Sequence, residues 1–307
     1  MYRRYLKFFW LAPLVLHSLN AHAWGLVTHI YFAQQWLIWS MPLLDPRLRQ
    51  AVQKFPELVM AGSCLPDLAL VSPSFRHTHQ WETCREMLLS AASDEEIAIS
   101  LGYASHLFVD VVAHNHFVPA HEAMWFEKTL ITHIASEWAV DAHVASLIEN
   151  SKQSTPHQLL QRHRSILIPF LAQRFRCGEK RTTNALDRLA NADRLLRTIR
   201  LPQAIYFSLK RLDNKVFHNF EYYVSLTQAM LPQMDSLLNG SRPLWEADPS
   251  LDKASLSEWR QHCLSHMKQR HPKPIGHYSP APILCQNIMN NLAMMPPSKA
   301  PTSTSVG

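Results

Sequence analysis

The chain has 307 residues, of which 47% are hydrophobic and 18% charged, and its formal net charge is +6. This length and composition are sufficient for a buried core and exclude a largely disordered protein. Seven glycines are few for a phosphate-binding loop or a turn-rich β protein, because both need glycine at tight turns. Eighteen histidines are many for a chain of this size, so their positions direct the search for function.

The first 23 residues have the pattern of a secretory signal peptide. Three basic residues precede an apolar stretch at 8–19, which is too short to span a membrane, and Ala21-His22-Ala23 is a small-x-small cleavage pattern. Cleavage after Ala23 would remove the three basic residues, so the basic balance is weak evidence for a nucleic-acid partner. The sequence therefore predicts an exported protein, periplasmic or secreted, that begins at Trp24.

The five cysteines include no CxxC pair, which argues against a thiolate zinc cluster. In an oxidising compartment they allow up to two disulfides with one thiol left over, and the sequence leaves their pairing open. They are Cys64, Cys84, Cys177, Cys263 and Cys285.

Apolar residues recur with helical spacing along nearly the whole chain, which predicts an all-α fold in one domain over 24–295. Asp45-Pro46 and Ser93-Asp-Glu-Glu96 are capping signals, and the second opens a long helix through Ala113. The end of the chain, 296–307, is rich in proline and serine and is predicted to be a disordered tail. Further helices are expected over 28–40, 122–149, 156–176, 182–199, 202–238 and 255–270.

Two of the expected helices each place a histidine and a carboxylate four residues apart. The pairs are His106 with Asp110 and His133 with Glu137, and each projects from one helix face. Helical bundles build metal sites from such pairs, and imidazole with carboxylate suits zinc. A hydrogen bond on the helix surface is the plainer alternative. The apolar neighbours of His106 favour burial, where a metal ion would compensate the polar groups.

Three other regions add metal-binding groups. A free α-amino group at Trp24 and the carbonyl oxygen of the same residue can chelate a cation in a five-membered ring, which His29 would complete. Asp67 and His79 add a carboxylate and an imidazole. Taken alone, Asp67 would more often be a helix cap or turn residue, and His79 a solvated loop histidine.

The order of these motifs resembles the zinc-dependent phospholipase C family, whose superfamily also includes the single-strand-specific zinc nucleases. The resemblance covers about 24–140. The motifs in this order are together more specific than any one of them alone. The motifs are Trp-Gly-x-x-Thr-His, Pro-Asp, His-x-Trp, His-x-x-x-Asp, a histidine six residues later, and His-x-x-x-Glu.

The resemblance implies a mostly helical fold that holds about three zinc ions, with ligands assigned position by position. The first ion would be held by Asp67, His79, His106 and Asp110. The second would be held by His116, His133 and Glu137. The third would be held by Trp24, His29 and Asp110, so that Asp110 bridges two ions.

Some ligand choices stay open within this resemblance. His77 is an alternative to His79, and His116 is preferred to His114 because of its six-residue spacing from Asp110. His121, Asp141 and His143 are expected outside the ligand set.

The resemblance also implies hydrolysis of a phosphodiester, with Asp67 orienting or deprotonating the attacking water. Glu137 and the Thr28-His29 start resemble the phospholipase branch, so a phospholipid is the first substrate hypothesis. A single-strand-specific nuclease or nucleotidase, and a non-catalytic zinc-binding envelope protein, are the alternatives. Peripheral membrane contact fits the first hypothesis, no stable nucleic-acid complex is expected, and the oligomeric state is left open.

Overall fold

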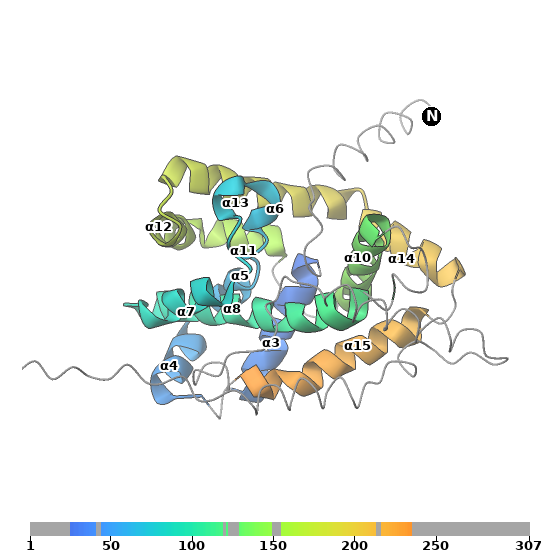
Figure 1. The fold of residues 1–307 in the computed structure, drawn as a ribbon, viewed down its shortest axis with the longest axis horizontal. Coiled ribbons are helices and arrows are strands. Elements are labelled where there is room, and N and C mark those ends of the chain that lie inside the picture. Colours follow the sequence, from blue (N-terminus) through green and yellow to red (C-terminus); the bar gives the residue numbers. More distant parts are fainter. Residues whose placement is uncertain are drawn as a thin grey trace, which may run out of the picture.

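The computed structural model describes residues 25–40, 44–118, 121, 129–148, 155–212 and 216–234. Every regular element in these ranges is helical, which confirms the predicted all-α fold (Figure 1). None of the described helices combines the length and apolar character that crossing a membrane requires. Trp24, the predicted signal peptide, the predicted helix at 255–270 and the predicted tail lie outside the described residues.

The helices differ widely in length. In chain order they are α3 (Leu26–Ser40), α4 (Pro46–Lys54), α5 (Pro56–Gly62), α6 (Leu68–Val71), η2 (Pro73–Phe75), α7 (Trp81–Leu89), α8 (Asp94–Val112), the π turn η3 (Ala113–Phe117), α10 (Thr129–Ile148), α11 (Pro156–Arg162), α12 (Arg164–Arg174), α13 (Glu179–Thr198), α14 (Leu201–Leu212), α15 (Val216–Met230) and η4 (Leu231–Gln233).

Helix α8 is the core of this fold, and α3, α4, α5 and α7 pack against it. Every residue from Ile97 to Val112 is buried, as expected for a helix that is covered on all sides. The crossing with α5 is close, because a Cβ on Gly102 would overlap the carbonyl oxygen of Val59. His106 and Asp110, in the second half of α8, are therefore held in the interior.

Both predicted capping signals are confirmed. The Asp45 side chain accepts a hydrogen bond from the backbone N–H of Arg47 at 2.9 Å, and Ser93 Oγ accepts one from Glu96 N at 3.2 Å. The Glu96 carboxylate accepts from the N–H of Ala92 at 2.8 Å, one residue before the position that a regular capping box uses. The start of α8 is thus fixed by its own sequence.

Several helices differ from the sequence prediction. Helices α5, α6 and α7 were not predicted; α5 and α6, with 7 and 4 residues, are too short to show helical periodicity. The helix expected over 156–176 is divided at His163 into α11 and α12. The helix expected over 202–238 is divided into α14 and α15, and 213–215 lie outside the described residues.

Three of the five cysteines are free thiols: Cys64 and Cys84, which are buried, and Cys177. Burial raises the pKa of Cys84 to about 12, so this thiol stays protonated and unreactive near neutral pH. No disulfide joins these three cysteines, and the other two, Cys263 and Cys285, lie outside the described residues. The upper limit of two disulfides and their pairing therefore stay a prediction.

Candidate metal centre

Three groups of histidine and acidic side chains meet beside the second half of α8. Within each group, potential ligand atoms of all members lie within 4.8 Å of one another. The groups are His29 with His106 and Asp110, Asp67 with His79 and His106, and His114 with His133 and Glu137. The structure thus brings together side chains from α3, α8, η3, α10, the residue before α6 and the loop before α7.

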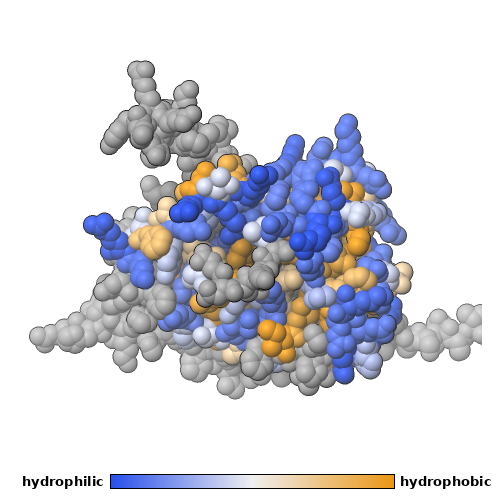
Figure 2. Space-filling model, turned by 180° about the vertical axis from the view of Figure 1, so that it is seen from behind, coloured by the Kyte–Doolittle hydropathy of each residue, from blue (hydrophilic) through white to orange (hydrophobic). Residues whose placement is uncertain are grey.

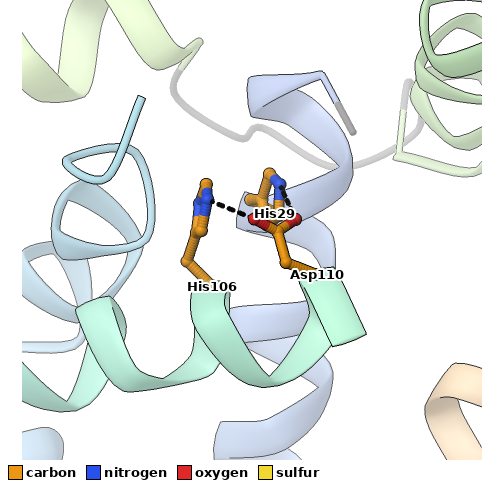
Figure 3. A group of neighbouring side chains, drawn as sticks. All are labelled: His29, His106 and Asp110. Atoms are coloured by element: carbon orange, nitrogen blue, oxygen red, sulfur yellow. Dashed lines mark ion pairs between the residues drawn. The ribbon is translucent and has the colours of Figure 1, made fainter. Parts of the chain in front are cut away.

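Asp110 is the residue that links these groups. Its Oδ1 lies 3.3 Å from His29 Nε2, and its Oδ2 lies 3.0 Å from His106 Nε2 (Figure 3). The Nε2 atoms of His79 and His114 face the same Oδ2, at 3.6 and 3.9 Å. One carboxylate therefore contacts a histidine of every group, which is the arrangement that a bridging ligand requires.

The packing of α3 against α8 forms the first group. His106 and Asp110 are one helical turn apart on α8 and project toward α3, which carries His29 (Figure 3). The rings of His29 and His106 are stacked, with centroids 3.6 Å apart and planes inclined by 15°. The i, i+4 pair is therefore buried between helices, and the alternative of a surface hydrogen bond does not apply to it.

Hydrogen bonds on the outer side of two imidazoles determine which nitrogen faces the centre. His106 Nδ1 lies 2.8 Å from the carbonyl oxygen of Ser63, so Nδ1 carries the proton. His79 Nδ1 lies 3.4 Å from Thr78 Oγ1, whose own proton is donated to the carbonyl oxygen of Pro66. Both Nε2 atoms consequently present lone pairs to each other, 3.4 Å apart, as metal ligands do.

The loop that carries His79 is attached to α8. The hydroxyl of buried Tyr103 on α8 donates a hydrogen bond to the carbonyl oxygen of Thr78. His77, two residues before His79, is exposed; its Nε2 accepts a hydrogen bond from Arg76 Nε at 2.8 Å. The structure thus places His79 in the centre and His77 outside all three groups.

The polar atoms of the centre fit a divalent cation. Asp67 Oδ1, both oxygens of Asp110 and both ring nitrogens of His29 are buried without a hydrogen bond of regular geometry. Leaving such groups buried is costly unless a cation compensates them. Ligand atoms at the usual zinc distance lie about 3.3 Å apart around a tetrahedral ion. The separations around Asp110, 3.0–3.9 Å, lie near this value.

The two carboxyl groups differ in their electrostatics. Burial raises the pKa of Asp67 well above its usual value, with the charge of Asp110 adding to the effect. Burial by itself would also raise the pKa of Asp110, but His106 and His29 outweigh it and hold this pKa well below its usual value. Within the protein alone, the two histidines favour the ionised form of Asp110, whereas burial favours the protonated form of Asp67.

The third group combines α10 with the end of α8. His133 Nε2 lies 2.7 Å from Glu137 Oε1 one turn later on α10, and the rings of His133 and His114 have centroids 5.3 Å apart. The sequence analysis preferred His116, whose side chain lies outside the described side chains. His114 had its own signal, because it stands four residues after Asp110 and continues the face that His106 begins.

Asp141, expected outside the ligand set, supports the centre from behind the ligands. Its Oδ1 accepts hydrogen bonds from the N–H and the hydroxyl of Thr28, at 2.9 and 3.2 Å, and Arg197 Nη2 donates to its Oδ2 at 2.9 Å. Gly25 packs so closely on this carboxylate that a Cβ would overlap it. Both oxygens are occupied, so Asp141 anchors the first turn of α3, one residue before His29, rather than binding an ion.

We expect Asp141→Ala to weaken zinc binding about 10- to 100-fold, because residues that orient metal ligands have effects of this size. Competition with a zinc-chelating dye measures the affinity. In a His29→Ala background the same change should have almost no further effect, since the anchored ligand is already gone. An equal loss in both backgrounds would contradict this role of Asp141.

Arg174→Ala is a matched control for Arg197→Ala. Arg174 is similarly buried and pairs with Glu96 at 3.1 Å, away from α3. Both substitutions should lower the melting temperature, but only Arg197→Ala should weaken zinc binding.

Comparison with known proteins agrees with this geometry. Residues 28–177 match the family model described as zinc dependent phospholipase C. This region contains every member of the three groups. No curated protein and no solved structure matches the chain.

Proposed function

Because the chain belongs, through residues 28–177, to the zinc-dependent phospholipase C family, we propose that it is an exported hydrolase that cleaves phospholipid phosphodiesters. The convergence of three groups of zinc-type ligands on Asp110 is the observation that carries this proposal. A purely structural zinc site is closed by four protein ligands around one ion. Here, in contrast, three groups of ligands share one carboxylate.

In this proposal the centre holds more than one ion. One ion would be held by Asp67, His79, His106 and Asp110. A second would be held by His133 and Glu137 with His114 or His116. A third would be held by His29 and Asp110, with the α-amino group and carbonyl oxygen of Trp24 after cleavage.

Zinc in these positions would polarise the phosphoryl group and lower the pKa of a water molecule. Asp67 would orient the attacking water and accept its proton. The water oxygen forms a bond to phosphorus, the bond from phosphorus to the leaving oxygen breaks, and that oxygen takes up a proton from solvent. The reaction consumes one water and needs no redox partner.

Substrate access is easiest at the third group. The His133 side chain is 15% exposed, whereas the other histidine and carboxylate side chains of the centre are at most 5% exposed. We therefore propose that the phosphodiester approaches from the α10 side.

The decisive experiment is an assay of the exported protein on phosphatidylcholine in mixed micelles, after chelation and again after addition of zinc. Zinc-restored release of a phosphorylated head group and diacylglycerol is expected; phosphatidic acid and free choline would mean cleavage on the other side of phosphorus. The same preparation is tested on single-stranded DNA. Cleavage of DNA alone would replace the proposal with a nuclease, and zinc binding without either cleavage would favour a binding role.

A further prediction concerns the amino terminus. One alanine inserted before Trp24, with the new terminus verified by sequencing, should remove one zinc ion and most activity, because the α-amino group is displaced. A glycine added at the carboxyl terminus is the control. Unchanged zinc content in the extended protein would exclude Trp24 as a ligand.

A further inference from the structure

The corner where α13 ends and α14 begins has an unusual composition. The segment 194–212 contains five basic residues and no acidic residue. Helix α14 continues from the end of α13 at the edge of the fold (Figure 1). A long stretch of one charge sign beside apolar residues is typical of a surface that meets an anionic partner.

Large apolar side chains are exposed within the same segment. Leu195, Ile199 and Phe207 are 54%, 44% and 65% exposed, and they are half of the large hydrophobic residues exposed in the described part of the chain. On the rear face of the molecule, exposed apolar side chains form separate patches in a mostly hydrophilic surface (Figure 2). Three such residues within one basic segment are therefore more than scattered surface hydrophobics.

The helical register separates an inner from an outer face. Leu195 on α13 and Ile199, which caps the end of that helix, are both exposed, while Arg197 between them pairs with Asp141. On α14, Tyr206 and Leu209 pack against the core, which leaves Phe207 outside. The exposed cations beside these apolar residues are Arg194, Arg200, Lys210 and Arg211. The segment 194–212 thus exposes both apolar and basic side chains to solvent.

This segment contacts elements that carry the metal centre or its anchor. Arg197, in the middle of the segment, holds the Asp141 carboxylate that anchors α3 one residue before His29. Helix α14 packs on α10, which carries His133 and Glu137. The corner is therefore attached to these elements through Arg197 and through helix α14.

We propose that this corner, formed by Leu195, Ile199, Phe207, Arg194, Arg200, Lys210 and Arg211, docks the protein on a membrane surface that contains anionic phospholipid. The apolar side chains enter the boundary between head groups and acyl chains, and the basic side chains pair with lipid phosphates. Nucleic acid fits less well, because bases stack on aromatic rings, and two of the three exposed apolar residues are aliphatic. The proposed phospholipid activity explains why docking would be useful, and the inference rests on it in that respect. Binding to a membrane does not itself require hydrolysis.

Vesicle sedimentation of the zinc-loaded protein tests this proposal. We expect binding to an equimolar mixture of phosphatidylcholine and phosphatidylglycerol, and much weaker binding to phosphatidylcholine alone. Arg200→Glu with Arg211→Glu, and Ile199→Ser with Phe207→Ser, should each weaken binding about tenfold or more. The matched control is Arg85→Glu with Leu89→Ser, which changes an exposed cation and an exposed leucine on α7 and should leave binding unchanged.

Three results would overturn the proposal. The first is equal vesicle binding by the corner and control variants, and the second is vesicle binding that does not depend on anionic lipid. The third is that the corner variants lose affinity for single-stranded DNA but not for vesicles. Hydrolysis of a dispersed short-chain phospholipid separates the two proposals. If the protein hydrolyses it without binding vesicles, only the docking surface is wrong. If the protein binds vesicles through this corner and hydrolyses nothing, only the proposed activity is wrong.

Discussion

Asp110→Ala should bind at least two fewer zinc ions per chain than the unchanged protein. The reason is that the two oxygens of this carboxylate face different histidines, His29 on one side and His106 with His79 on the other. Metal analysis of the dialysed protein, together with native mass spectrometry, measures the number of ions. This is the largest expected effect of any single substitution in the centre.

His133→Ala is the comparison for Asp110→Ala. It removes a ligand of one group only, so it should cost one ion. Melting of the chelated forms shows whether either variant fails to fold without metal. Loss of one ion or none from a folded Asp110→Ala protein would exclude the bridging role.

Asp67→Asn should lower kcat by about 100-fold or more, because the amide cannot accept a proton from water. The amide has nearly the same shape as the carboxyl group, so the melting temperature should change little. Glu57→Gln changes a carboxylate outside the centre, one that pairs with Arg162 and His163, and should leave kcat unchanged. A rate loss no larger than the stability loss would make Asp67 a structural residue.

The fold class and part of the centre follow from local sequence patterns. His106 with Asp110 and His133 with Glu137 are separated by one helical turn, so the sequence alone places each pair on one face. The caps at Asp45 and Ser93 are equally local, and the structure has both. Such features need no knowledge of which helices pack together.

Other parts of the centre depend on contacts that the sequence does not display. His79 rather than His77 reaches the centre because Tyr103 and Pro66, distant in sequence, hold the intervening Thr78. The role of Asp141 arises only when α10 packs beside the start of α3, across 113 residues. Neither arrangement produces a repeating sequence pattern from which it could be predicted.

The anchor of α3 has a consequence for the order in which the protein assembles. Thr28 is held by Asp141, and Asp141 is in turn held by Arg197, a further 56 residues along the chain. During synthesis the beginning of a chain emerges first, but contacts of high sequence separation form late. The turn that carries His29 is therefore fixed only once α10 and α13 have packed beside it.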